Sequence, residues 1–244
     1  MTRTTAILLA LLGALPAPVA AKTFTPPEGC TLFMTVQARA CRVSNHYKCV
    51  QDPAGDQWRA DFDQEGVYFL SRIDAEAQWI ESYDLYPTTR QSLDANPNDP
   101  ASFSELLTTG TDTFAFGLTK DDGSRTRVSG FDTLTGTTVT IDGIALKETQ
   151  FEFTETDLSG TITRQSRGRE YIHPDWRLFF AGPSEWDGGT GEYVPIDGSP
   201  RMFFFPGEPG FAATEPLYEC DAILSSFPVP AQQFFPQPAK AATP

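Results

Sequence analysis

Apolar and polar residues alternate along most of this chain, and a period of two is typical of β-strands that bury one face. In residues 31–38, for example, Leu32, Met34 and Val36 fall on one face. We predict strands over residues 31–38, 58–62, 67–73, 78–86, 114–118, 125–131, 161–172, 176–181 and 201–205, and a long strand that contains Phe151 and Phe153.

Short polar segments that contain glycine separate several of these strands. Residues 63–66 and 121–124 have turn compositions, and Asp142-Gly143 between two isoleucines is a strong signal for a tight hairpin. Such short connections join antiparallel neighbours.

One segment, residues 98–110, has a helical pattern instead. Asp99 is suited to cap the helix, Pro100 to occupy its first position, and Gly110 to end it. Its apolar residues form one stripe, so we expect the helix to cover an opening or a face of the sheet.

The pattern predicts an all-β fold, mainly an antiparallel meander of about ten strands. Consecutive strands joined by tight turns favour a strongly curved sheet or a barrel-like fold with one short covering helix, and a two-sheet sandwich is the alternative. At the level of fold, this pattern is similar to the half-barrels of periplasmic lipoprotein carriers and to calycin-like barrels.

The chain divides into three parts by composition. Residues 1–21 have a positive start, a short apolar run and a small-residue end, which predict a signal peptide cleaved after Ala21. We expect residues 22–227 to form a single β-rich domain, and the Pro- and Ala-rich residues 228–244 to be a disordered tail. The predicted location is therefore periplasmic or secreted.

The formal net charge of −14 affects the choice of partners. It disfavours nucleic acid and anionic membrane surfaces, and it favours cations or basic surfaces. After the apolar run near the start, no segment is long and apolar enough to span a membrane.

The four cysteines predict two disulfides in an exported protein. The segment between the middle two cysteines is symmetric about Asn45, so a hairpin centred there would join Cys41 to Cys49 and leave Cys30 to pair with Cys220. A four-cysteine metal site would require a close pair such as C-x-x-C, which is absent.

Few residues support the common catalytic chemistries. Of the two histidines, His46 falls in the expected hairpin tip and His173 at a strand end, and the chain has no G-x-S-x-G motif, P-loop or dinucleotide fingerprint. Acid–base chemistry on a glycoside would require paired carboxylates. The candidates are Glu148, Glu152, Glu155, Asp157, Glu170, Asp175, Glu185 and Asp187.

Aromatic residues give a second kind of candidate site. In residues 176–181 large apolar side chains fall on both faces, which indicates a strand covered on both sides. If the interior is hollow, aromatic rings would line an apolar pocket. We predict a pocket wall formed by Trp79, Tyr171, His173, Trp176 and Phe180.

The glycine-rich loop after this strand brings oxygen ligands together, so Asp187 and Glu192 are candidates for Ca²⁺, the one cofactor considered. Three functions remain. The first is a non-catalytic exported protein that binds an apolar, lipid-like small molecule or an envelope protein. The second is a structural or assembly protein that acts through its surface and tail, and the third is a carboxylate-dependent hydrolase.

Overall fold

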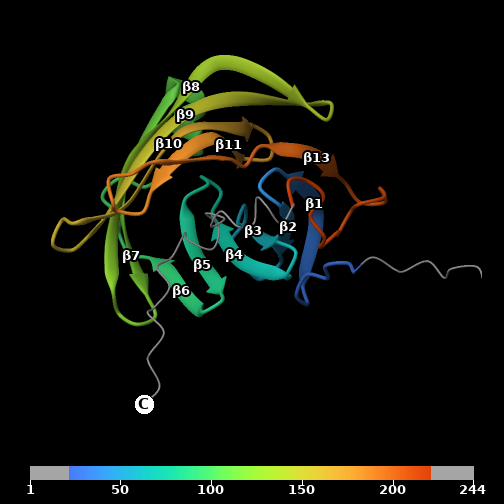
Figure 1. Cartoon of the computed structure of the whole chain (residues 1–244), viewed down its shortest axis with the longest axis horizontal. Coiled ribbons are helices and arrows are strands. Elements are labelled where there is room, and N and C mark those ends of the chain that lie inside the picture. The colour runs from blue at the N-terminus through green and yellow to red at the C-terminus, as the bar shows by residue number, and fades with distance from the viewer. Residues whose placement is uncertain (1–21, 221–244) are drawn as a thin grey trace, which may run out of the picture.

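A single antiparallel sheet of thirteen strands contains most of the regular structure of residues 22–220, the part of the chain that this computed structural model describes (Figure 1). The strands are β1 (Cys30–Ala38), β2 (Arg42–Cys49), β3 (Gln57–Phe62), β4 (Val67–Ile73), β5 (Trp79–Leu85), β6 (Thr88–Leu93), β7 (Thr111–Lys120), β8 (Arg125–Ile141), β9 (Ile144–Asp157), β10 (Ile162–His173), β11 (Leu178–Asp187), β12 (Val194–Asp197) and β13 (Pro200–Phe204). Their order is β12 to β1 in sequence, with β13 added beside β1.

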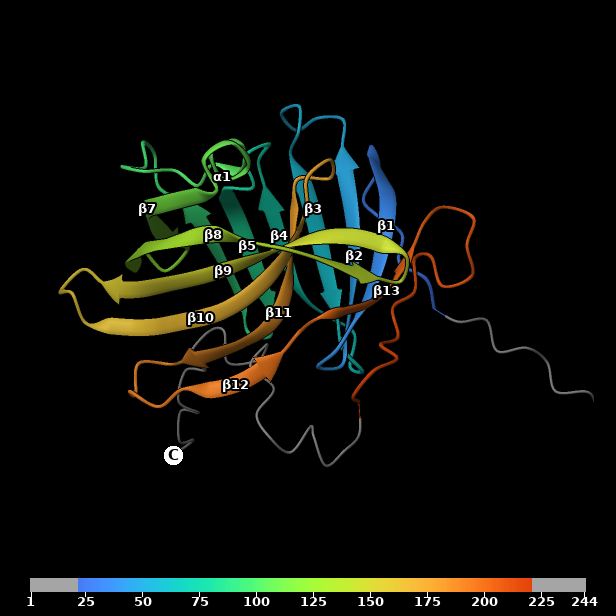
Figure 2. The same ribbon diagram turned by 90° about the horizontal axis from the view of Figure 1, so that it is seen from above.

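The sheet is strongly curved but not closed, which confirms the predicted meander and not the sandwich. In Figure 2, strands β8–β12 lie in front of β1–β5, so the two halves of the sheet face each other. The edge strands β12 and β13 follow each other in the chain, and Gly198 between them donates a backbone hydrogen bond to Gly182 at 3.4 Å.

The tip of the β10–β11 hairpin lies on the concave side of the sheet, against strands far away in sheet order. The side-chain amide of Gln57 in β3 donates to the carbonyl of Trp176 at 2.9 Å. The rings of His46 in β2 and Phe180 in β11 are 6.1 Å apart. These contacts fix the curvature, because they join the two halves of the sheet across its concave side.

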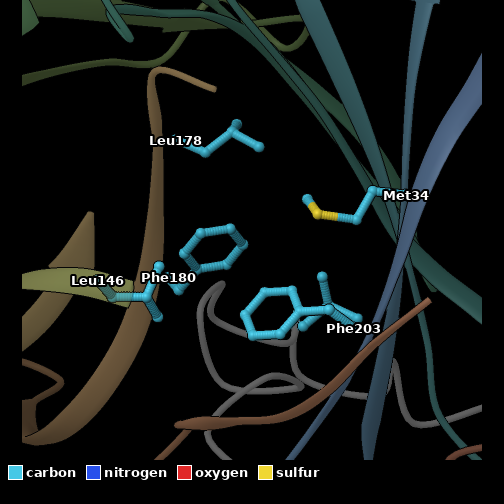
Figure 3. Packing of buried hydrophobic residues seen from close by; sticks show 6 residues of the cluster. Met34, Leu146, Leu178, Phe180 and Phe203 are labelled. Carbon is cyan, nitrogen blue, oxygen red and sulfur yellow. The ribbon is translucent and has the colours of Figure 1, made fainter. Parts of the chain in front are cut away.

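A large hydrophobic cluster fills this region. Figure 3 shows its buried residues, which come from β1, β9, β11 and β13. The buried members are Met34, Val36, Leu146, Leu178, Phe180 and Phe203. Burial of such side chains contributes about 1.5–3 kcal/mol each, so this cluster is a main source of stability.

Both faces of the start of β11 are covered, as the sequence predicted. Leu178 and Phe180 pack in the cluster of Figure 3. Phe179, on the opposite face, packs against Phe103 and Leu106 of the helix α1 (Phe103–Thr109).

The helix begins later than the sequence predicted. Ser102, not Asp99, caps it by accepting a hydrogen bond from the backbone of Glu105, and Gly110 ends it in the left-handed region at φ 89°. Asp99 and Ala115 form an isolated β-bridge instead, which holds the segment before the helix extended.

Several strand assignments differ from the prediction: β2 replaces a hairpin expected at Asn45, and β8 runs beyond residue 131 to Ile141. Strand β11 does not end at Gly182-Pro183 but continues to Asp187, because Pro183 pairs with the short edge strand β12. Proline has no amide hydrogen to donate, and it is tolerated here because the β10–β11 register shifts between Gly168 and Glu170 and leaves Pro183 unpaired with β10. Strands β6 and β12 were not predicted, since their sequences, TTRQSL and VPID, lack a clear apolar alternation.

The predicted disulfide pairing was wrong. The bonds are Cys30–Cys49 and Cys41–Cys220. The β1–β2 hairpin turns at residues 39–41, where Cys41 has φ 51°, so Cys30 and Cys49 are directly opposite each other. Asn45 is therefore not at a hairpin tip.

The described residues do not include the predicted signal peptide, residues 1–21, or the predicted tail, residues 228–244. No helix within residues 22–220 is long and apolar enough to cross a membrane.

Candidate functional site

Cross-strand pairing places a continuous row of polar residues on one face of the sheet. Residues directly opposite each other in neighbouring strands share a face. From β2 to β6 the row contains His46, Arg59, Ser71, Ser82 and Gln91.

The row continues through the other half of the sheet. Gln91 pairs with Lys120 at the end of β7. Asp112 lies on the same face of β7, because side chains of one strand alternate between faces. It pairs with Asp132 of β8, which pairs with Phe151 of β9.

This face is the concave one. Glu170 in β10 experiences the charges of Asp132 in β8 and of Arg59 in β3, although six strands separate β3 from β10 in the sheet. Likewise, Asp84 in β5 experiences the charge of Arg164 in β10. Charges on such distant strands interact only if they face each other across the curve.

Several buried polar atoms on this face lack a hydrogen-bond partner among the described residues. They are His46 Nδ1, Asp84 Oδ2, Gln91 Oε1, Asp112 Oδ1, Asp132 Oδ1 and Trp186 Nε1. Native proteins leave few buried polar atoms unsatisfied, and each one calls for a partner such as water or a ligand. A cluster of six on one face therefore marks the concave side as the candidate site.

Three carboxyl groups form the most unusual part of it. Asp112 and Asp132 are directly opposite each other on β7 and β8. Glu170 lies on β10 on the same face, two residues beyond the row that contains Asp132. Burial raises the pKa of Asp112 to about 6, against the effect of a hydrogen bond from the Ser102 backbone. Burial, together with their mutual repulsion, also raises the pKa values of Asp132 and Glu170.

These carboxyl groups have little cationic compensation. Near Asp112, the other charges that act on its pKa are the acidic Glu105, Asp99 and Glu76. Arg59 alone lowers the pKa of Glu170, and its Nε also lies 3.1 Å from Asp61. This part of the site therefore has a surplus of acids.

A second group of charges on the same face is balanced. Arg164 forms an ion pair with Glu155 at 3.1 Å. Burial raises the pKa of Asp84 to about 7, although Lys120 and Arg164 oppose that rise. With two acids and two bases, this group does not require an external ion.

Phenylalanine rings lie next to the acidic group. Phe114 pairs with Gly130, and Gly130 with Phe153, in the row beside Asp112 and Asp132. A Cβ atom on Gly130 would lie 2.7 Å from the Phe114 ring and 2.8 Å from Cβ of Phe153. Glycine is required there because the backbone carbonyl of Glu152, the ring of Phe114 and Cβ of Phe153 occupy the space that a side chain would need.

The structure brings together four of the five predicted pocket-wall residues. Trp176 stacks on His173 with ring centroids 3.7 Å apart, and it also contacts the ring of Phe180. Tyr171 and Trp176 pack against the cluster of Figure 3, whereas Trp79 packs against a different cluster around Phe116. The rings pack against one another, and their role as a pocket wall stays a prediction.

Both histidines have structural surroundings. His46 was predicted to lie at a hairpin tip, but this prediction was wrong. The residue lies within β2 and is only 3% exposed. Burial, with the charges of Arg59 and Arg42, lowers its pKa to about 3. His173 Nδ1 accepts the backbone hydrogen of Trp176 at 3.3 Å, which closes the β10–β11 turn.

The two calcium candidates do not come together around an ion site. Asp187 Oδ1 accepts hydrogen bonds from the backbone of Thr190 at 2.8 Å and of Gly191 at 3.1 Å, so this carboxylate closes its own loop. Glu192 is exposed. Within residues 22–220, no three His, Cys, Asp or Glu side chains are arranged to hold a metal ion.

A shallow groove of about 510 Å³ also lies between β9, β10 and β11. Its arginines already have acidic partners, since Arg167 contacts Glu185 at 2.5 Å and Arg169 contacts Glu148 at 3.2 Å. The concave face is the stronger candidate because its polar atoms lack such partners.

Sequence reasoning included Glu170 among its carboxylates but missed Asp112 and Asp132. The turn at residues 121–124, which was predicted, sets the β7–β8 register and would have placed these two residues opposite each other. No family model, curated protein or solved structure matches this chain.

Proposed function

We propose that this chain is an exported, non-catalytic binding protein that holds a small, lipid-like ligand against the concave face of its sheet. The observation that carries this proposal is the set of buried polar atoms without partners beside phenylalanine rings on that face. Ligand sites combine apolar walls with a few polar groups that orient the ligand.

The disulfides support the compartment. Two disulfides among the described residues fit an oxidising environment outside the cytoplasm. Within that class, we propose the periplasm, on the basis of the signal peptide predicted from residues 1–21.

A neutral apolar dye such as N-phenyl-1-naphthylamine tests the proposal. The protein, first extracted with organic solvent, is expected to bind the dye at a saturable site and enhance its fluorescence. The variant Phe114→Ser, on the concave face, is expected to weaken binding about tenfold or more. Leu158→Ser, at a turn where Leu158 is 53% exposed, is the matched control and leaves binding unchanged.

The proposal fails if the extracted protein binds no dye and mass spectrometry of the untreated protein finds no co-purified molecule. It also fails if both variants weaken binding equally, since the dye would then not be on the concave face.

A carboxylate-dependent hydrolase is the second candidate. The raised pKa values of Asp132 and Glu170 favour it, because a carboxylic acid that is neutral near pH 7 can donate a proton. Turnover of chromogenic glycosides by the protein, lost in Asp132→Asn, would support this candidate over the first.

The envelope-assembly hypothesis has less support. The most exposed large apolar side chains, Val50, Tyr86 and Leu217, come from separate segments of the chain. Binding of an envelope protein would be tested by pull-down with the concave-face variant Phe114→Ser, and unchanged capture would assign that partner to another surface.

A further inference from the structure

We propose that the ligand carries a positively charged amine, which is held between Asp112, Asp132 and Glu170 and the neighbouring phenylalanine rings. This inference rests on the proposed function and specifies the chemistry of the ligand. It begins from the placement of three acidic side chains for which the described residues supply one nearby cation, Arg59, which is shared with Asp61.

The first step is the register of β7, β8, β9 and β10. Cβ atoms of directly opposite residues lie about 4.5–5.5 Å apart, and like charges placed there destabilise a sheet. Asp112 and Asp132 occupy such a pair, and Glu170 reaches the same region from β10. A cation among the three groups would turn this repulsion into attraction.

The second step is an unsatisfied atom inside the site. Asp112 is 4% exposed, and its Oδ2 accepts a hydrogen bond from the Ser102 backbone at 2.9 Å. Its Oδ1 has no partner among the described residues, and neither does Asp132 Oδ1. Both atoms are acceptors when ionised, so the missing group must supply donors.

The third step is the aromatic surface beside the carboxyl groups. Phe151 pairs with Asp132 itself, and Phe114 and Phe153 flank Gly130 in the next row. Faces of aromatic rings attract organic cations, and the combination of rings with carboxylates is typical of ammonium recognition. The rings therefore favour an amine over a bare metal ion.

Helix α1 gives the site a closed end. Its Phe103 and Leu106 pack against Ile172 and Leu134, which lies on β8 two residues beyond Asp132. At the other side, the apolar cluster around Phe116, with Leu118 and Val128, continues along the same face. An amphiphile would thus place its amine near the helix and its chain along this cluster.

Binding has a chemical consequence for the carboxyl groups. Without a cation, burial and mutual repulsion keep their pKa values high, so a fraction is protonated near pH 7. An ammonium group stabilises the ionised forms. Amine binding therefore releases protons to the solvent, whereas binding of a neutral molecule does not.

The test compares two probes with the same chain, dodecylammonium and dodecanol, below their aggregation limits and with the full chain after solvent extraction. Dodecylammonium is expected to bind at least about tenfold more tightly at pH 7.5. The double variant Asp132→Asn/Glu170→Gln is expected to remove this preference, so that the two probes bind with similar affinity. Glu152→Gln, which alters an exposed carboxylate on the opposite face of β9, is the matched control.

The outcomes separate the two proposals. If both probes bind equally, or if the double variant keeps the preference, the amine inference is overturned and the proposed function stands. If neither probe binds, the proposed function itself fails. A far-UV circular dichroism spectrum that matches that of the natural chain shows that the double variant is folded.

Calorimetry in phosphate and in Tris provides an independent readout. Proton release makes the observed enthalpy of dodecylammonium binding depend on the buffer, and the double variant is expected to lose most of that dependence. Buffer-independent enthalpy for the natural chain, or full displacement of dodecylammonium by Ca²⁺ at equal concentration, would contradict an amine site.

Discussion

Replacing Asp112 with asparagine should make the protein's stability less sensitive to a rise in pH from acid to neutral. Asp112 is almost fully buried opposite Asp132, and burial raises its pKa from 3.8 to about 6. A group whose pKa is higher in the folded state binds protons more tightly there. Its contribution to stability is complete below the unfolded pKa and is lost as the pH rises through the folded pKa.

The magnitude follows from the two pKa values. One tenfold change in proton affinity corresponds to about 1.4 kcal/mol. A rise from 3.8 to about 6 therefore corresponds to about 3 kcal/mol, most of which is lost between about pH 4 and pH 7. Asparagine does not ionise, and its amide oxygen can still accept the hydrogen bond from Ser102. The variant should gain about 3 kcal/mol relative to the natural chain over this range.

Urea denaturation of both proteins at a series of pH values measures this difference, with solvent-extracted protein so that no ligand contributes. His46 acts in the opposite direction, because its pKa is lowered to about 3 and its contribution grows as the pH rises to about 6.5. Both proteins contain His46, so its effect cancels when the two unfolding free energies are subtracted.

The reasoning is refuted if that difference stays constant from pH 4 to pH 8. It is also refuted if the variant loses stability relative to the natural chain as the pH rises, because Asp112 would then be stabilised as an anion.

Two further predictions concern the framework. Removing the Cys41–Cys220 bond, which closes a separation of 179 residues, should cost about 5 kcal/mol, and removing Cys30–Cys49, with a separation of 19, about 3 kcal/mol. Each kcal/mol corresponds to about 2–4 °C in Tm, so calorimetry should find a larger drop in Tm when the Cys41–Cys220 bond is removed. A larger drop for the Cys30–Cys49 bond would contradict the chain-entropy account. Gly130→Ala should lower the unfolding free energy by about 1–3 kcal/mol in urea, since the new methyl group meets the Glu152 carbonyl and the Phe114 ring; an unchanged value would show that β8 and β9 can shift to make room.

The sequence was sufficient to predict the class of fold because alternation and turn chemistry are local. The Asp142-Gly143 hairpin and the turn at residues 121–124 were both predicted, and they set which strands are neighbours. The cysteine pairing depended on one turn. A symmetric sequence around Asn45 indicated a hairpin there, but Asn45 is buried in β2, where Thr35 donates to it at 2.7 Å and it donates to the Ala213 carbonyl at 2.9 Å.

The acidic site depends on registers that the sequence predicts only in part. The β7–β8 pairing follows from its turn, so Asp112 and Asp132 could have been matched by counting. The β8–β9 pairing could not, because a bulge between Leu134 and Thr138 shifts the register. The electrostatic interaction of Glu170 with Asp132 and with Arg59 requires the curvature of the whole sheet, which no local pattern encodes.

Curvature therefore connects the fold to the proposed chemistry. In a flat sheet these carboxyl groups would be exposed to water, which weakens the repulsion between like charges. They would then form no specific binding site. Folding the sheet back brings β10 against β3 and removes water from Asp112, so the same carboxyl groups acquire raised pKa values and unsatisfied acceptors. The free energy for holding them there comes from the hydrophobic clusters on either side. A cationic ligand would recover part of that free energy, so ligand binding and sheet stability should rise together in the natural chain and become uncoupled in Asp132→Asn/Glu170→Gln.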